Sequence, residues 1–229
     1  MHIGALIFPD IDQMDFTGPF EVLARLPDAK IHILWKDLAP VRDSFGLLLT
    51  PTATLQSALP PLDVLVVPGG RGQLPLMADE TVLAWLRSAA AQAGYILSVC
   101  TGALTLGAAG LLRGKRTTTH WNSFHLLSYF GAIPEDARVV VDGNLISAAG
   151  VSSGIDGSLR LAALLAGEEV AQRIQLEIQY APEPPFSAGT PAQAPESILS
   201  SARQRAGALT AARLEAAQRA ADRLRSAGS

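Results

Sequence analysis

Residues 95–103 read YILSVCTGA, and this stretch indicates the fold of the chain. Its first five residues form a short apolar run, which is typical of a strand buried on both faces. Cys100 follows at once, and small residues lead from it into a helical stretch. Ser98 and Gly102 stand two positions before and after Cys100, where small side chains permit a sharp strand-to-helix turn. The stretch therefore predicts a nucleophile elbow, with Cys100 at the carboxyl end of a buried strand.

The flanking sequence alternates apolar runs with amphipathic stretches, a pattern that predicts a mostly parallel sheet with helices on both faces. We expect strands at 2–8, 30–35, 63–67, 95–99, 138–141 and 144–147, with a hairpin piece at 47–50. We expect helices at 17–26, with Thr17 as the N-cap, and at 79–93, 154–165 and 168–180. The expected fold class is α/β, and ligands of such sheets bind beyond the carboxyl ends of the strands.

The composition changes after residue 181, which we take as the end of an α/β domain at 1–181. Residues 182–195 contain five prolines, which favour an extended linker. Residues 196–229 contain six arginines and many alanines, and they predict one long helix. Its apolar residues fall roughly along one side, at Ile198, Ala202, Leu209 and Leu224. We expect this helix to pack on the body or on a partner subunit, rather than to bind nucleic acid, because arginines on a helix usually form a solvated face.

The overall composition excludes several classes of protein. The chain has 229 residues, 48% of them hydrophobic, and a formal net charge of −3. These values exclude a disordered chain and a general nucleic-acid binder, which needs a basic balance. One cysteine and four scattered histidines provide no disulfide framework and no convincing metal site. The N-terminal residues MHIGALIFPD lack a signal-peptide pattern, and no apolar run is long enough to span a bilayer, so we expect a cytoplasmic protein without a membrane partner.

Two effects at the predicted turn are expected to lower the pKa of the Cys100 thiol. A helix N-terminus presents unpaired N–H groups and a positive partial charge. Thiolates at such positions have pKa values of about 3.5–7.5, against about 8.5 for a free cysteine. The backbone N–H of Thr101 would also face charge that develops on a substrate. Cys100 is therefore predicted to be a reactive nucleophile, and a buried inert cysteine and a redox-sensing cysteine stay open as alternatives.

A thiolate nucleophile needs a partner that transfers protons. Asp10, Asp12 and Asp15 all lie in or near the loop after the first strand, at the same predicted edge of the sheet. The residues alone do not choose between them, and each could instead be a capping or solvated aspartate. His120 is a further candidate base, but a buried histidine held by hydrogen bonds accounts for it better.

Glycines after two other strands are candidate binding positions. Gly69 and Gly70 follow the strand at 63–67 and could present backbone N–H groups to an oxyanion, although an ordinary tight turn has the same pattern. Gly150 follows a later strand and precedes a helix, where a small residue permits a close approach or mobility. The alternative for Gly150 is a plain loop at the start of a helix.

At these residues the chain resembles the ThiJ/PfpI branch of the class I glutamine amidotransferase-like superfamily, over about residues 1–180. The matching motifs are VPGG at 67–70, SVCTGA at 98–103 and TTHW at 118–121. Within this branch the chain is similar to the bacterial isocyanide hydratases. That likeness lies in LIFPDIDQMDFTGP at 6–19, GAAGLLRGK at 107–115, GID at 154–156 and YAPEPPFSAG at 180–189.

The resemblance implies a flavodoxin-like three-layer sandwich, usually a homodimer, with Cys100 as the nucleophile. It selects Asp15, because isocyanide hydratases carry an aspartate where many superfamily members carry a glutamate. Thr101 stands where protease-like relatives have a histidine, which argues against hydrolase activity. The implied reaction is hydration of a small-molecule isocyanide, R–N≡C, to an N-formamide through a thioimidate on Cys100, without cofactor or metal. Asp15 would act as general acid and base, and the Thr101 hydroxyl would hydrogen-bond Asp15 or the attacking water.

Three other functions stay open at this point. The same turn could serve a glyoxalase- or deglycase-like enzyme acting on α-oxoaldehydes, or a redox sensor that uses oxidation of Cys100. The TTHW and CTGA segments also resemble the effector domain of AraC-type transcription regulators. Their DNA-binding region contains two helix-turn-helix units, which need more than the 34 residues that follow Pro195. We therefore expect no partner among nucleic acids.

Overall fold

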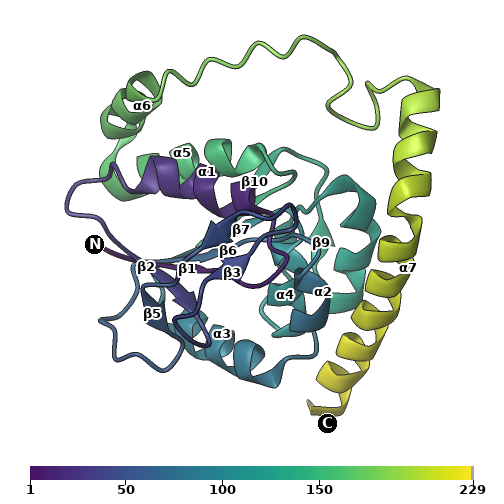
Figure 1. The fold of residues 1–229 in the computed structure, drawn as a ribbon, viewed down its shortest axis with the longest axis horizontal. Coiled ribbons are helices and arrows are strands. Elements are labelled where there is room, and N and C mark those ends of the chain that lie inside the picture. The colour runs from purple at the N-terminus through teal and green to yellow at the C-terminus, as the bar shows by residue number, and fades with distance from the viewer. Residues whose placement is uncertain (228–229) are drawn as a thin grey trace.

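The computed structural model describes residues 1–227, in which seven strands form one central sheet (Figure 1). They are β1 (His2–Leu6), β2 (Lys30–Trp35), β5 (Ala53–Thr54), β6 (Val64–Val67), β7 (Tyr95–Val99), β10 (Val139–Asp142) and β11 (Leu145–Ala148). Their order is β10-β11-β7-β6-β1-β2-β5, and only β10 runs antiparallel to its neighbour. Two smaller sheets have two strands each: β3 (Val41–Arg42) pairs with β4 (Leu48–Leu49) in antiparallel fashion, and β8 (Arg116–Thr117) pairs with β9 (Ile133–Pro134) in parallel. The predicted, mostly parallel sheet is confirmed.

Helices cover both faces of this sheet. They are α1 (Gln13–Leu23), α2 (Gln73–Leu76), α3 (Glu80–Gln92), α4 (Gly102–Ala108), α5 (Ser153–Ala166), α6 (Glu168–Glu177), α7 (Glu196–Ala227) and the 3₁₀ helix η1 (Trp121–Phe130). Figure 1 shows α1 and α5 together on one face, and α2, α3 and α4 on the other. The three-layer arrangement expected from the alternation of strands and helices is therefore present.

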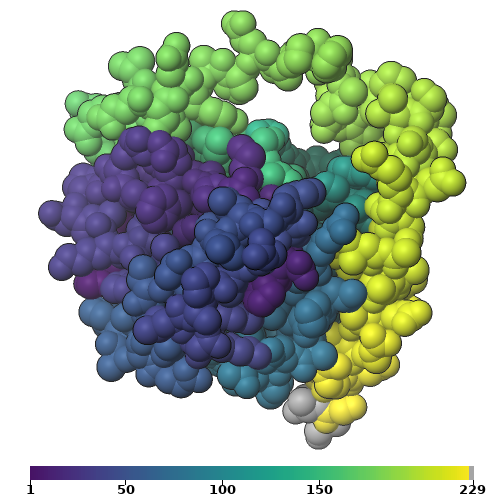
Figure 2. Space-filling model, viewed as in Figure 1, coloured from purple at the N-terminus to yellow at the C-terminus, as the bar shows by residue number. Residues whose placement is uncertain are grey.

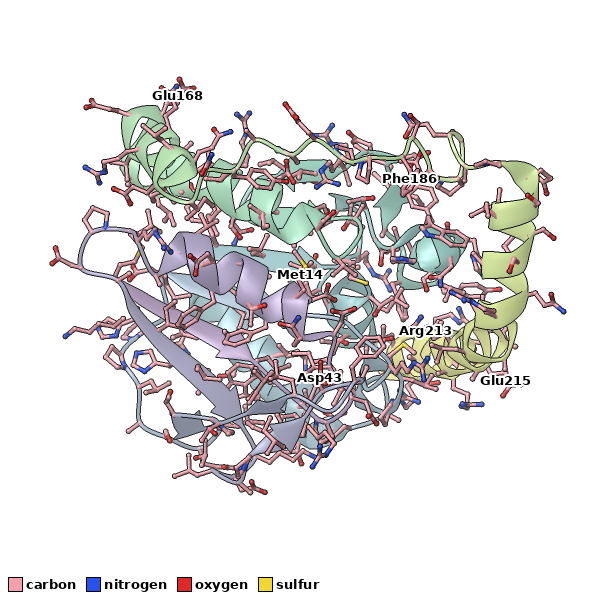
Figure 3. The ribbon with its side chains drawn as sticks, turned by 45° about the horizontal axis from the view of Figure 1, so that its top comes forward. Met14, Asp43, Glu168, Phe186, Arg213 and Glu215 are labelled. Atoms are coloured by element: carbon pink, nitrogen blue, oxygen red, sulfur yellow. The ribbon has the colours of Figure 1, made fainter. Side chains whose placement is uncertain are left out.

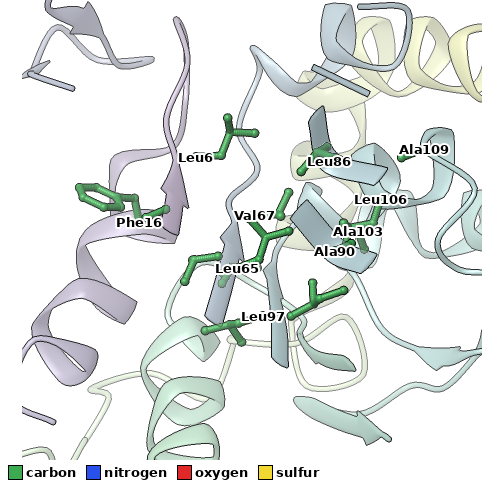
Figure 4. Close-up of a cluster of buried hydrophobic side chains, with 14 of the residues drawn as sticks. Leu6, Phe16, Leu65, Val67, Leu86, Ala90, Leu97, Ala103, Leu106 and Ala109 are labelled. Carbon is green, nitrogen blue, oxygen red and sulfur yellow. The ribbon is translucent and has the colours of Figure 1, made fainter. Parts of the chain in front are cut away.

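Strands β6 and β7 lie in the middle of the hydrophobic core. All four residues of β6 are buried, because helices cover the sheet above and below them. Figure 4 shows Leu65 and Val67 of β6 and Leu97 of β7 among side chains of the covering helices, such as Leu86 and Leu106. Burial of one leucine side chain contributes about 1.5–3 kcal/mol. This core holds the carboxyl ends of β6 and β7 side by side.

The first helix begins earlier than we predicted. α1 starts at Gln13, and its N-cap is Asp12, whose side chain accepts a backbone hydrogen bond from the first turn at 3.2 Å. Thr17, the predicted N-cap, lies inside the helix and donates to Gln13 Oε1 at 2.7 Å. The prediction was wrong because it put Pro19 near the first turn, where proline fits best, whereas α1 has Pro19 in its interior. Asp15 consequently lies in the first turn of α1 rather than in the preceding loop.

Several short elements escaped the sequence analysis. Strands β5, β8 and β9 and helix α2 have two to four residues each, which is too short to display a hydrophobic period. The helix predicted at 168–180 ends at Glu177. Beyond the end of α6, Tyr180 donates its hydroxyl hydrogen to Asp156 Oδ2 at 2.8 Å. A local sequence pattern cannot predict such a tertiary contact.

The C-terminal segment leaves the body of the protein and then returns to it. Residues 182–195 are almost entirely exposed, and Figure 2 shows an opening beneath this part of the chain. Helix α7 then packs along η1, α4 and α2, with Ala217 and Ala220 buried in the contact. Of the two packing partners expected from the sequence, the helix contacts the body of its own chain.

The predicted apolar side of this helix is partly wrong. Ile198 is 56% exposed, because the neighbouring Leu199 takes the buried position instead. Farther along, the buried surface of α7 consists mainly of alanines, whose small side chains let the helix approach the body closely. Residues 228 and 229 of the predicted helix at 196–229 lie outside the described residues.

Candidate active site

Cys100 lies on a strained turn between β7 and α4. Its φ is +55°, a left-handed conformation that costs a non-glycine residue about 1–3 kcal/mol. Two hydrogen bonds hold the turn: Cys100 N donates to Ala148 O at 2.9 Å, and Thr119 Oγ1 donates to Cys100 O at 2.7 Å. The structure thus contains the strand-to-helix turn that the sequence predicts, and adjacent segments stabilise its unusual backbone.

Two glycines let the loop after β6 approach this turn. A Cβ atom on Gly69 would lie 2.5 Å from Thr101 N, and one on Gly102 would lie 2.0 Å from Val67 O. Both distances are well below van der Waals contact, and both neighbours are backbone atoms. Residues without a side chain are therefore required where the carboxyl ends of β6 and β7 meet at the site.

Asp15 is fully buried and reaches the site from the first turn of α1. Its Oδ2 accepts a hydrogen bond from Gly69 N at 2.9 Å, whereas Oδ1 has no hydrogen-bond partner within residues 1–227. Burial, reinforced by the nearby Asp12 carboxylate, raises the pKa of Asp15 from 3.8 to about 8. The Gly69 N–H and the Cys100 thiol oppose this rise in pKa only in part. Asp15 can therefore give and take a proton near neutral pH, as the predicted role requires.

The pKa of Cys100 differs from our expectation. Burial, followed by the proximity of Asp15, raises the pKa of the thiol well above its ordinary value, while the Thr101 N–H and Arg213 lower it. The expected lowering by the helix N-terminus is present through that Thr101 N–H, but desolvation outweighs it. Burial disfavours the charged form of both groups, and the Asp15 carboxylate further disfavours the Cys100 thiolate, so the two groups titrate as a coupled pair.

The other residues expected to bind an oxyanion have partners inside the protein. Gly69 N donates to Asp15, and Gly70 N donates to Thr101 Oγ1 at 3.2 Å. The Thr101 hydroxyl donates to Gly70 O at 3.4 Å and so joins the two loops; of the two partners that we expected, Asp15 or the attacking water, its hydrogen bonds within residues 1–227 do not include Asp15. The backbone N–H of Thr101 is the donor that acts on the thiol.

A cavity of about 150 Å³ opens above the Cys100 thiol. Its walls come from the loops after β1, β3, β6, β7 and β11, from η1 and the residue before it, and from α7. The lining residues are Asp12, Ser44, Phe45, Gly70, Arg71, Cys100, Thr101, His120, Asn122, Val151 and Arg213. Polar groups thus surround the thiol, while Phe45 and Val151 supply apolar surface for the remainder of a small ligand.

Gly150 and His120 lie at one side of this cavity. Gly150 is not part of the wall; its carbonyl accepts a hydrogen bond from Ser153 N at 2.9 Å at the start of α5. His120 is half-buried, and its Nδ1 is 2.8 Å from Asn122 Oδ1. Burial lowers the pKa of His120, so the ring is neutral near pH 7. These contacts suit a hydrogen-bonded wall residue better than a catalytic base.

Several residues that line the cavity were not named in the sequence analysis, and Arg213 of α7 is the buried cation among them. Its side chain is 4% exposed and lines the cavity, and its Nη2 donates to Gly70 O at 2.7 Å. Figure 3 shows Arg213 directed from α7 toward the body of the protein, unlike Glu215. A signal existed in the sequence: Arg213 stands at helical spacing from Ala217 and Ala220, on the face that alanines bury.

Within residues 1–227, no three histidine, cysteine, aspartate or glutamate side chains converge as a metal site would require. None of the helices in this part of the chain combines the length and hydropathy needed to cross a membrane.

Comparison with known proteins reveals close relatives. The sequence pattern of the DJ-1/PfpI family matches residues 1–163. A Pseudomonas putida protein named isonitrile hydratase is 53% identical over 224 residues, or 98% of each chain. Protein DJ-1alpha of Drosophila melanogaster is 30% identical over 176 residues, or 74% of this chain and 79% of that one. The crystal structure of a ThiJ/PfpI family protein from Pseudomonas syringae superimposes with a TM-score of 0.92 at 40% identity, covering 94% of this chain and 90% of the other.

Proposed function

This chain belongs to the DJ-1/PfpI family, and from that membership we propose that it is an isocyanide hydratase, which converts R–N≡C and water to the N-formamide R–NH–CHO. Isonitrile is another word for isocyanide, and the near-full-length similarity to the Pseudomonas putida isonitrile hydratase supports this substrate class. The observation that carries the chemistry is the buried Cys100–Asp15 pair beneath a small cavity. An enzyme of this type needs one nucleophile and one group that moves protons in both directions.

The first step starts from the reactive form of the pair, in which Asp15 keeps its proton and Cys100 is the thiolate; the raised pKa of the thiol makes this a minor form near pH 7. The sulfur attacks the terminal carbon of the isocyanide and forms a C–S bond. Asp15 delivers its proton to that carbon, which yields a thioimidate, Cys100–S–CH=N–R, and leaves Asp15 as a carboxylate. The raised pKa of Asp15 suits this step, because a carboxylic acid with a pKa of about 8 still holds its proton at pH 7.

In the second step water adds to the thioimidate carbon. The Asp15 carboxylate takes a proton from the attacking water and passes it to the nitrogen, which produces a tetrahedral carbon bearing O–H, S and NH–R. Asp15 then removes the hydroxyl proton, the C–S bond breaks, and the N-formamide leaves. The thiolate of Cys100 and the protonated Asp15 are restored, so that atoms and charges balance over the cycle.

The surrounding residues suit this reaction. The N–H of Thr101 faces the sulfur and stabilises negative charge there. The Gly69 N–H holds Asp15 Oδ2, so Oδ1 without a hydrogen-bond partner is the oxygen available for proton transfer. The isocyanide group is linear and narrow, which matches a cavity of about 150 Å³. Phe45 and Val151 would contact the R group.

The test is conversion of an aryl and an alkyl isocyanide to the formamide, followed by NMR with the wild type and Cys100→Ala in parallel. We expect formamide from the wild type alone, since the chain has one cysteine. Formamide from Cys100→Ala would contradict the covalent route. No formamide from either protein, together with lactate formed from methylglyoxal by the wild type, would replace this proposal with α-oxoaldehyde chemistry.

We further propose that the enzyme is a cytoplasmic homodimer. Large apolar side chains are exposed at Leu176 and Phe186, each 79% accessible, and a partner subunit could cover such surface. A cysteine that must stay reduced suits a reducing compartment. Light scattering after size exclusion should give a mass near twice 24.0 kDa. A mass equal to one chain would contradict the dimer and would leave the proposed chemistry standing.

A further inference from the structure

The guanidinium group of Arg213 is buried and has no ion-pair partner within residues 1–227. The side chain is 4% exposed, and its described contact is the hydrogen bond from Nη2 to Gly70 O. Its Nε is buried and has no hydrogen-bond partner within residues 1–227. By contrast, Arg219 on the same helix pairs with Glu215 at 3.5 Å on the surface. A buried charge that lacks a partner is unfavourable, so the position of Arg213 calls for a compensating negative charge.

The Cys100–Asp15 pair can supply that charge, because both groups interact electrostatically with Arg213. Cys100 lines the same cavity as Arg213, and Asp15 adjoins Cys100 from α1. Burial lowers the pKa of Arg213, and Cys100 and Asp15 oppose that fall, while Arg213 acts to lower the pKa of each of them. When the pair shares one proton, it carries one negative charge, and Arg213 supplies one positive charge. The cluster is then neutral as a whole, which reduces the cost of burying it.

Other charged groups also face this cluster: Asp12 before α1, Arg71 after β6, and His120 before η1. Asp12 adds negative charge and so works against a thiolate. His120 is neutral near pH 7, because burial lowers its pKa. Arg71 is exposed, so water screens its charge. Among the groups that line this cavity, Arg213 is thus the buried permanent cation.

We propose that Arg213 is a positioning residue of the active site: it balances the negative charge of the Cys100–Asp15 pair and thereby favours the Cys100 thiolate. Helix α7 is then part of the catalytic unit and not an appendage. The same side chain holds the carbonyl of Gly70, whose N–H contacts the Thr101 hydroxyl, so it also fixes the loop beside the thiol. This inference rests on the thiolate role of Cys100 in the proposed function.

The test measures the thiolate directly and does not require turnover. Iodoacetamide is uncharged and alkylates thiolates, and because the chain has one cysteine, the rate reports on Cys100 alone. The rate is measured against pH for the wild type, for the neutral variants Arg213→Gln and Arg213→Met, and for the conservative variant Arg213→Lys. We expect both neutral variants to react about tenfold more slowly at pH 7.5, with the midpoint of the profile displaced by about one unit to higher pH. Arg213→Lys keeps the charge and should recover much of the rate.

Arg223→Gln is the matched control. Arg223 is on the same helix, and its Nη2 also donates to a backbone carbonyl, that of Met77, but it does not line the cavity. Its loss should lower the thermal midpoint without displacing the alkylation profile. An unchanged profile in folded Arg213→Gln or Arg213→Met, or an equal displacement in Arg223→Gln, would overturn the proposal. A displaced profile in an enzyme that forms no formamide would support the role of Arg213 while refuting isocyanide hydration.

Discussion

Replacement of Asp15 by asparagine should stabilise the protein and abolish its activity. Burial raises the pKa of Asp15 from 3.8 to about 8, so at pH 7 the carboxyl is protonated in the folded state and ionised in the unfolded state. An acid with a raised folded-state pKa loses stability as pH rises from its unfolded pKa to its folded pKa. Asparagine is neutral in both states, and its side-chain oxygen can still accept the hydrogen bond from Gly69 N.

The size of this stability difference follows from the shift in the pKa of Asp15. Between pH 3.8 and pH 7 the wild type loses about 1.36 kcal/mol per pH unit over about three units, or roughly 4 kcal/mol of unfolding free energy relative to Asp15→Asn. The difference between the two proteins should keep growing up to about pH 8 and then level off. At pH 4, close to the unfolded-state pKa of 3.8, the difference should be small, because ionisation of Asp15 in the unfolded chain has only begun to favour unfolding.

Urea denaturation at pH 4, 5, 6, 7 and 8 measures this difference. Asp136→Asn is the control, because it removes a carboxylate at the surface and so matches the change in net charge. A stability difference between wild type and Asp15→Asn that stays constant from pH 4 to pH 8 would refute the reasoning, since it would mean that burial does not shift the carboxyl. Activity is measured on the same preparations. Wild-type rates in Asp15→Asn would remove its role in proton transfer.

Three further predictions concern the turn and its chemistry. Mass spectrometry after a rapid quench should find a substrate adduct on Cys100, and turnover without any adduct at any time would point to direct attack by water. Cys100→Gly should be about 1–2 kcal/mol more stable to urea than Cys100→Ala, because φ is +55° at this position; equal stabilities would mean that the turn relaxes. Gly102→Ala should lose about 1–3 kcal/mol of unfolding free energy or fail to fold, because its Cβ would lie 2.0 Å from Val67 O. A thermal melt, followed by circular dichroism, that matches the wild type would contradict this close packing.

Much of the fold can be predicted from local sequence patterns. The buried strand at Tyr95–Val99 and the small residues around Cys100 predict the strand-to-helix turn, which the structure contains. The N-terminus of α1 could not be predicted from local patterns, since aspartate and threonine are both good N-cap residues. The choice between Asp12 and Thr17 depends on whether the helix accommodates Pro19 in its interior. The short elements were missed because two to four residues carry no period.

What the sequence by itself determined is the α/β fold, the cysteine at the strand end and the segment after the first strand that carries the candidate aspartates, because these follow from short-range periodicity and from turn chemistry. Only the tertiary structure decided how the site is charged. The burial of Cys100 and Asp15 raises both pKa values, and burial is a property of the whole assembled core. Arg213 joins them because α7 folds back along η1 and α4, a contact between segments far apart in the chain. Electrostatic interactions act across space and not along the sequence, so no local pattern could place this cation beside the thiol.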